Sequence, residues 1–149
     1  MGAGSNQALF LSPSSVNGNT GTYRQILGDT VVPGMTYLLT VAVGARDNGE
    51  DFAGYIISLG ADSGVLSTIS GIDAPALGSF EDVSLTYTAT DADSEFLDIS
   101  LAAGLTDASV DFTNVRLEAV PEASTWAAIG FAGIIGASVA WRQRRIATV

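Results

Sequence analysis

Carboxylates are the side chains of this chain that could do chemistry, because the usual nucleophiles and zinc ligands are missing. The sequence has no cysteine and no histidine, which rules out a Ser-His-Asp triad, a cysteine nucleophile and an ordinary zinc site. Acids gather in residues 46–51 (RDNGED) and 91–95 (DADSE). Their oxygens would suit Ca²⁺, but neither segment has the spacing of an EF-hand loop. Solvated turns are therefore the preferred interpretation of both segments.

A carboxylate enzyme is the first functional hypothesis to weigh. A glycosidase would need two acids roughly 5 to 10 Å apart in a cleft. Here the acid clusters lie in predicted turns of a short chain. The sequence therefore favours a protein that is not an enzyme.

Sugar binding is the second hypothesis, and it needs exposed aromatic rings beside polar groups. The candidates near predicted loops are Tyr55, Phe52, Tyr23 and Arg46. Packing in the core is the competing interpretation. Tyr55 shares one face of its predicted strand with Ile57, and most of the other aromatic residues also fall on predicted core faces.

The charge of the chain excludes one class of partner. Its formal net charge is -10, and every cation is an arginine. Three arginines, Arg142, Arg144 and Arg145, lie at the C-terminus, so the rest of the chain is more acidic still. Such a surface repels phosphate backbones, and we expect no binding to nucleic acid.

The elements that must position these side chains are strands. Apolar residues alternate with polar ones through most of the chain, Gly, Asp, Asn and Ser separate the runs, and no helical period precedes Trp126. Pro33-Gly34 suits a type II turn. The pattern predicts an all-β fold, an antiparallel jelly-roll-like β-sandwich over residues 1–119. The expected strands are residues 8–11, 21–27, 36–43, 54–60, 64–70, 80–89, 95–103 and 110–119.

A single C-terminal transmembrane helix is expected after this domain. Residues 126–141 carry no charge and have a tryptophan at each end, Trp126 and Trp141. As a helix they would extend roughly 24 Å at ~1.5 Å per residue, which suits a thin membrane. The arginines that follow would stay in the cytoplasm. A buried core helix is the competing interpretation, but Gly130, Gly133 and Gly136 disfavour it.

The end of the chain resembles a PEP-CTERM sorting signal, the bacterial tail recognised by the membrane enzyme exosortase. The resemblance rests on a motif, a short apolar helix and a basic end in the expected order. Ala123 replaces the second proline of the family's Pro-Glu-Pro motif. The motif and linker are residues 120–125, the helix 126–141 and the basic tail 142–149. The signal residues are Val120, Pro121, Glu122, Ala123, Ser124, Thr125, Arg142, Arg144 and Arg145.

This resemblance implies a destination. The precursor would lie in the inner membrane of a Gram-negative bacterium with its N-terminus outside, and exosortase would then release it to the envelope or the extracellular space. Residues 1–15 have no features of a signal peptide, so we expect the domain to be truncated at its N-terminus.

The predicted strands also resemble the jelly-roll sandwiches of carbohydrate-binding modules and galactose-binding-like domains. The resemblance rests on residues 25–44, 78–89 and the last strand, VDFTNVRL at 110–117. It implies that Asp111 could help to hold a structural Ca²⁺ that joins the last strand to the first. Thr113 stands where the family has a second acid. No other cofactor is expected.

These observations predict a non-enzymatic, exported surface or extracellular-matrix protein. The alternative is a carbohydrate-binding module that associates with extracellular polysaccharide. Exosortase, the membrane and that polysaccharide are the expected partners.

Overall fold

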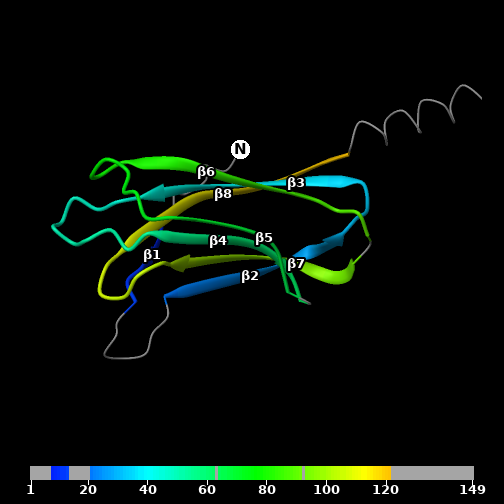
Figure 1. The fold of residues 1–149 in the computed structure, drawn as a ribbon, viewed down its shortest axis with the longest axis horizontal. Coiled ribbons are helices and arrows are strands. Elements are labelled where there is room, and N and C mark those ends of the chain that lie inside the picture. The colour runs from blue at the N-terminus through cyan, green and yellow to red at the C-terminus, as the bar shows by residue number, and fades with distance from the viewer. Residues whose placement is uncertain (1–7, 14–20, 63, 92, 122–149) are drawn as a thin grey trace, which may run out of the picture.

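The structure, a computed structural model, describes residues 8–13, 21–62, 64–91 and 93–121 as two antiparallel sheets packed face to face (Figure 1). One sheet has the strand order β1-β8-β3-β6, and the other has the order β2-β7-β4-β5. The predicted all-β sandwich is confirmed. The strands are β1 (Leu9–Leu11), β2 (Thr22–Val31), β3 (Met35–Gly44), β4 (Tyr55–Ala61), β5 (Gly64–Gly71), β6 (Phe80–Thr88), β7 (Asp93–Ala103) and β8 (Val110–Pro121).

Alternating side chains from both sheets build one core. Leu39, Val41 and Val43 of β3 are fully buried and face the second sheet, where Leu59 and Leu97 are buried just as deeply. Because successive side chains of a strand point to opposite faces, the residues between these project away from the core. That geometry assigns Asp98 and Ser58 to the outer face of the second sheet.

The link between β2 and β3 forms as the sequence predicts. Gly34 has a φ of 73°, which a type II turn requires at its third position. The Met35 amide donates to the Val32 carbonyl at 3.3 Å and closes the turn.

The predicted C-terminal segments lie mostly outside the described residues. Val120 and Pro121 are the last two residues of β8, so the final strand extends past the predicted boundary at residue 119. The rest of the predicted motif, the predicted helix at 126–141 and the basic tail at 142–149 fall beyond Pro121. Within the described part of the chain, no helix is long and apolar enough to cross a membrane.

Candidate functional site

A buried acid lies on the outer face of the second sheet. Asp98 of β7 stands between Leu97 and Ile99, which point into the core, and is itself only 5% exposed. The neighbouring strand β4 places Ser58 and Gly60 beside it, Ser100 lies two residues further along β7, and these small residues leave a cavity of about 300 Å³. A Cβ atom at Gly60 would lie 3.0 Å from both Asp98 carboxylate oxygens. The absence of a side chain at Gly60 therefore makes room for this carboxylate.

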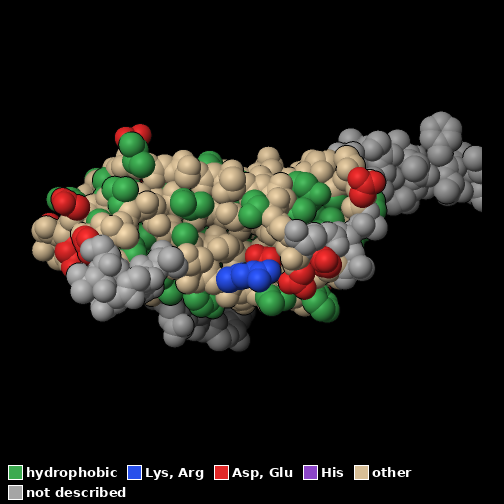
Figure 2. Space-filling view, turned by 60° about the horizontal axis from the view of Figure 1, so that its bottom comes forward, with side chains coloured by type: hydrophobic (Ala, Val, Ile, Leu, Met, Phe, Trp, Pro, Cys, Tyr) green, Lys and Arg blue, Asp and Glu red, His purple; other side chains and the backbone are tan. Residues whose placement is uncertain are grey.

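Arg24 of β2 covers one side of this carboxylate. Its Nη2 donates to Asp98 Oδ2 at 2.8 Å and to Asp62 Oδ1 at 3.3 Å. The hydrogen bond and the charge of Asp98 are the main causes that raise the pKa of Arg24 above its ordinary value. The Arg24 side chain is 48% exposed, whereas that of Asp98 is 7% exposed. Figure 2 shows basic and acidic side chains lying side by side on one face of the molecule.

We call the cavity around Asp98 the Asp98 pocket; Val65 lines it, and two further apolar side chains lie on the same outer face of the sheet as Asp98. Ile26 is the cross-strand neighbour of Asp98 on β2, and Phe96 precedes it by two residues on the same face of β7. Ile26 is 56% exposed, Phe96 48% and Val65, on the β5 side, 67%. A single buried charge beside exposed apolar groups suits a ligand that is largely apolar but carries or develops charge at one point.

The aromatic candidates for sugar binding do not gather in one cavity of the described structure. Tyr55 begins β4, and its ring lies against the backbone of Gly71, where an added Cβ would be 2.5 Å from the Tyr55 hydroxyl. Phe52 forms an isolated bridge with Ser109 and packs against the core. Tyr23 of β2 is 45% exposed and lines a separate cavity between β2 and β8.

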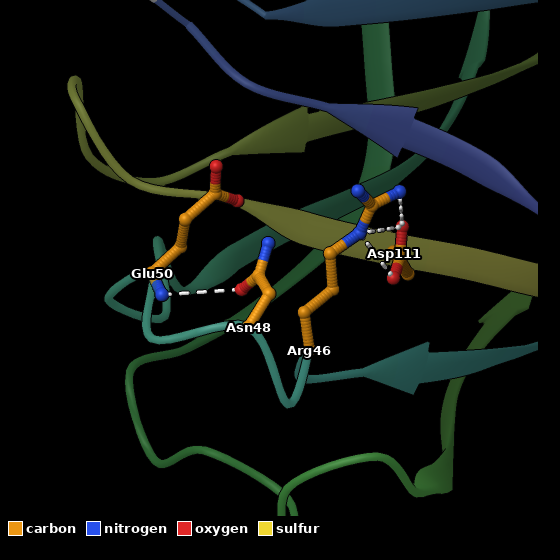
Figure 3. Close-up of polar contacts among 4 residues, drawn as sticks. All are labelled: Arg46, Asn48, Glu50 and Asp111. Carbon is orange, nitrogen blue, oxygen red and sulfur yellow. Dashed lines mark hydrogen bonds and ion pairs between the residues drawn. The ribbon is translucent and has the colours of Figure 1, made fainter.

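Arg46, the fourth candidate, is paired with Asp111 of β8, in the sheet that does not carry the Asp98 pocket (Figure 3). Its Nε donates to Asp111 Oδ2 at 3.1 Å, and its Nη2 donates to Oδ1 at 3.3 Å. The guanidinium carbon also lies 3.6 Å from the centre of the Phe10 ring. Phe10 is the cross-strand partner of Asp111, so Arg46 ties the end of β3 to both β8 and β1.

This arrangement does not fit the calcium site that the jelly-roll resemblance implies at Asp111. Both carboxylate oxygens already accept from a guanidinium, and Ca²⁺ needs six to eight oxygen ligands. The described residues contain no group of three or more acidic side chains that could hold a metal. Arg46 supplies the positive charge that balances Asp111.

The acidic loop after β3 is ordered by its own side chains. The Glu50 amide donates to Asn48 Oδ1 at 3.1 Å, which is a local turn contact (Figure 3). Hydrogen bonds from the side chains of Asn48 and Ser109, with a smaller contribution from the charge of Arg46, lower the pKa of the exposed Glu50 carboxyl. These contacts support the turn interpretation of residues 46–51.

Arg24 and Asp98 are the site residues that the sequence interpretation missed. The alternation in EFLDISLAA placed Leu97, Ile99 and Leu101 inside, and it thereby placed Asp98 on the outer face. The alternation therefore located Asp98, but it did not mark it as a site residue, because an acid on the outer face of a sheet is ordinarily solvated. Its burial depends on Arg24, which lies 74 residues earlier in the chain.

Comparison with known proteins gives a consistent result. Residues 2–118 match the HpiC1-like family, described as HpiC1 cyclase. A cyclase from Fischerella sp. TAU, solved in complex with 4-(1H-indol-3-yl)butan-2-one, is 30% identical with a TM-score of 0.60, over 66% of this chain and 56% of that one. The Stig cyclase Fisc from Fischerella sp. TAU, in complex with (3Z)-3-(1-methyl-2-pyrrolidinylidene)-3H-indole, is 30% identical with a TM-score of 0.59, at the same coverage of both chains.

This chain thus spans 56% of the length of each of those cyclase structures. A structure described as CBM4 is 18% identical to this chain with a TM-score of 0.52. The match covers 76% of this chain and 82% of the CBM4 chain. At that identity the likeness shows the fold alone. No curated protein matches the chain.

Proposed function

This chain belongs to the HpiC1-like cyclase family, and we propose that it is an enzyme that closes a ring in a small aromatic substrate. The proposed reaction site is the Asp98 pocket. The observation that carries the proposal is the buried carboxylate of Asp98, 5% exposed and 2.8 Å from Arg24 in a cavity of about 300 Å³. A buried charged group in a cavity is a common mark of a reaction site.

The prediction of a non-enzymatic surface or matrix protein is wrong. The family match over residues 2–118 and the likeness to solved cyclases overturn it, and they also displace the carbohydrate-binding alternative. The absence of histidine and cysteine excludes many enzyme mechanisms but not ring closure. A cyclisation needs no protein nucleophile, so one well-placed carboxylate is sufficient.

Asp98 would act on protons and on positive charge. A ring closure by isomerisation joins two atoms of one substrate, and it proceeds faster when a fixed group moves a proton or stabilises a cation in the transition state. A carboxylate can do both. Arg24 holds this carboxylate in position, and since its own side chain is half exposed, it can move aside without disturbing the core.

The substrate class that we propose is an indole derivative or a similar flat aromatic compound. The solved relatives were crystallised with indole-bearing ligands. In this chain Val65 lines the pocket and would contact the ring, the exposed Ile26 and Phe96 lie on the same face of the sheet, and Asp98 would face the atom that becomes charged.

The first test is binding of 4-(1H-indol-3-yl)butan-2-one to the full chain, measured by isothermal titration. Ser100→Leu should abolish binding because the added side chain fills the cavity beside Asp98. Ser84→Leu is the matched control, since Ser84 lies on the outer face of the other sheet beside Thr40. Equal binding by the wild type and Ser100→Leu would place the ligand elsewhere. Lack of binding by the wild type would contradict the substrate class.

The second test is turnover of a panel of 3-substituted indoles, followed by chromatography with mass detection for products of unchanged mass and altered retention. Asp98→Asn should reduce the rate by about 10²-fold or more, the usual contribution of a general acid or base. Asp82→Asn, an exposed acid paired with Arg116 at 2.9 Å, should leave the rate within about twofold. An Asp98→Asn variant with full activity would refute the assignment.

We also propose that the chain is exported, held in the inner membrane through residues 126–141 and processed by exosortase. The order of the Pro121-Glu122 motif, the uncharged stretch and the terminal arginines supports this proposal. In a host with exosortase, the intact mass of the envelope form should lack the residues that follow about Ala123. A mass that retains the tail would refute the processing step.

A further inference from the structure

One hydroxyl group in the lining of the Asp98 pocket is arranged to accept hydrogen bonds. Ser58 of β4 is the cross-strand partner of Thr68 on β5, and its Oγ lies 3.0 Å from Thr68 Oγ1. Thr68 Oγ1 donates to the Ile57 carbonyl oxygen at 3.2 Å. Because a hydroxyl has one hydrogen, Ser58 is the donor in its contact with Thr68. The Ser58 oxygen therefore offers only lone pairs to a ligand.

The charges that line the pocket also favour a ligand that donates. Its charged side chains are Arg24, Asp62 and Asp98, so one positive charge stands against two negative charges. Arg24 Nη2 donates to both carboxylates, at 2.8 Å to Asp98 and at 3.3 Å to Asp62. One nitrogen thus serves two acids, and the lining keeps an excess of negative charge. An added cation would balance this excess, whereas an added anion would be repelled.

The two carboxylates differ in their exposure. The side chain of Asp98 is 7% exposed, whereas those of Arg24 and Asp62 are 48% and 47% exposed. If Arg24 swings out toward Asp62, the arginine keeps a partner. Asp98 then needs another cation, because an unpaired charge is costly when it is buried. Displacement of Arg24 therefore becomes favourable when the ligand itself brings a positive charge.

We propose that the Asp98 pocket selects a ligand with a protonated amine, which takes the place of Arg24 at Asp98 while Asp62 retains the arginine. This inference rests on the proposed reaction site and narrows its substrate class to flat aromatic compounds that carry a basic side chain. An ammonium has three hydrogens to donate, and Asp98 and Ser58 both supply acceptors to the cavity. Charge-assisted hydrogen bonds are roughly twice as strong as neutral ones. Asp62 acts as a positioning residue through Arg24.

Three indoles of similar size test the selection by charge. They are tryptamine, which carries an ammonium, 3-propylindole, which is its neutral isostere, and indole-3-propionate, which carries a carboxylate. Isothermal titration of the full chain at neutral pH should give tryptamine an affinity about tenfold or more above that of 3-propylindole, with indole-3-propionate the weakest. Equal affinities, or tighter binding of the neutral compound, would overturn the proposal.

Substitutions of Asp62 test the retention of Arg24. Asp62→Asn removes one partner of the arginine and the excess negative charge, so tryptamine should bind about tenfold more weakly and 3-propylindole should change by less than about twofold. Asp62→Glu keeps the charge and should restore most of the affinity for tryptamine. Asp82→Asn is the matched control, because Asp82 is an exposed acid paired with Arg116 on the other sheet. It should leave both affinities within about twofold.

Two results with Asp62→Asn would overturn the proposal. An unchanged affinity for tryptamine would show that Asp62 has no part in the exchange. An equal loss for tryptamine and 3-propylindole would show that Asp62 has only a structural role.

Removal of the arginine gives an independent test. Arg24→Met leaves the buried Asp98 carboxylate without this donor, so the variant should bind tryptamine about tenfold more tightly than the wild type does. Tryptamine should also raise the thermal unfolding midpoint of Arg24→Met by more than it raises that of the wild type. Weaker binding of tryptamine by this variant would overturn the proposal. If Arg24→Met does not fold, the Asp62 variants decide.

The neutral ligand 4-(1H-indol-3-yl)butan-2-one separates this inference from the proposed function. If it binds, if Ser100→Leu abolishes its binding and if tryptamine has no advantage over 3-propylindole, the reaction site stands and the selection of an amine is overturned. If none of these indoles binds, both are overturned.

Discussion

At the scale of residues, three arginines of the described sandwich form ion pairs that join distant parts of the chain. Arg24, Arg46 and Arg116 each form an ion pair with an aspartate that lies far away in the sequence. Burial of the aspartate distinguishes the three pairs. The side chains of Asp98 and Asp111 are 7% and 13% exposed, whereas that of Asp82 is 53% exposed. We expect the first two pairs to matter for activity and stability, and the third to contribute little to stability.

The Arg46 contact predicts stability that does not depend on calcium. Arg46→Met should lower the free energy of unfolding by about 1 to 2 kcal/mol, because it leaves the partly buried Asp111 carboxylate without its donor. Arg116→Met, the exposed counterpart, should cost less than about 0.5 kcal/mol. Urea unfolding measures both values. The loss caused by Arg46→Met should be the same in excess EDTA and in calcium, and a loss that calcium makes good would contradict the assignment of Arg46 as the partner of Asp111.

Glu50 predicts a small pH dependence with a defined sign. Because Asn48 and Ser109 hold the pKa of Glu50 below its ordinary value of 4.5, folding is favoured by the charged form. This contribution is complete above pH 4.5 and is lost as the pH falls through the lower, folded-state pKa. Glu50→Gln should therefore be less stable than the wild type at pH 7, and the difference should shrink below pH 4.5. Thermal unfolding from pH 3 to pH 7 tests this, and a constant difference would contradict it.

At the scale of elements, glycines fix the places where strands and loops approach closely. Gly54, just before β4, has a φ of 70°, and a Cβ there would lie 2.8 Å from the Gly71 carbonyl oxygen. Gly49 has a similar φ of 79° but has open space around it. The two positions separate the cost of the backbone conformation from the cost of a steric clash.

Alanine at each of these glycines tests that separation. Gly49→Ala should destabilise the protein by about 1 kcal/mol through the left-handed conformation alone. Gly54→Ala should cost about 2 to 4 kcal/mol, since the backbone of Gly71 must also move. Urea unfolding of both variants gives the comparison. Equal losses would show that the Gly71 carbonyl exerts no steric constraint.

At the scale of the whole molecule, acidic charge is in excess. The net charge is -10 and the isoelectric point is about 4.1, with only three arginines in the described sandwich. Figure 2 shows acidic side chains toward both ends of the molecule, where the loops lie. Repulsion among these acids opposes the compact state.

Salt should therefore stabilise the protein. Raising sodium chloride from about 0.05 M to about 0.5 M shortens the screening length several-fold, which weakens repulsion among distant acids more than it weakens contacts at 2.8 to 3.3 Å. We expect the thermal unfolding midpoint to rise by a few degrees, as measured by circular dichroism. A fall would show that the ion pairs outweigh the general repulsion.

Within the described residues, the sequence by itself determined the strands and the class of fold. Alternation and turn residues predicted the eight strands of that part of the chain and the turn at Pro33-Gly34, because strand periodicity and turn geometry are local properties. The same pattern assigned Leu97 and Ile99 to the core. It could not point to the proposed ring closure, because such a reaction does not need the histidine or cysteine that the chain lacks.

Only the tertiary structure decided which charged groups meet. Arg24 lies 74 residues from Asp98, and Arg46 lies 65 residues from Asp111. These pairings follow from the order of the strands in each sheet, which depends on contacts between distant segments. The same non-local order made Asp98 a buried carboxylate and replaced the expected calcium ligand set with an ion pair.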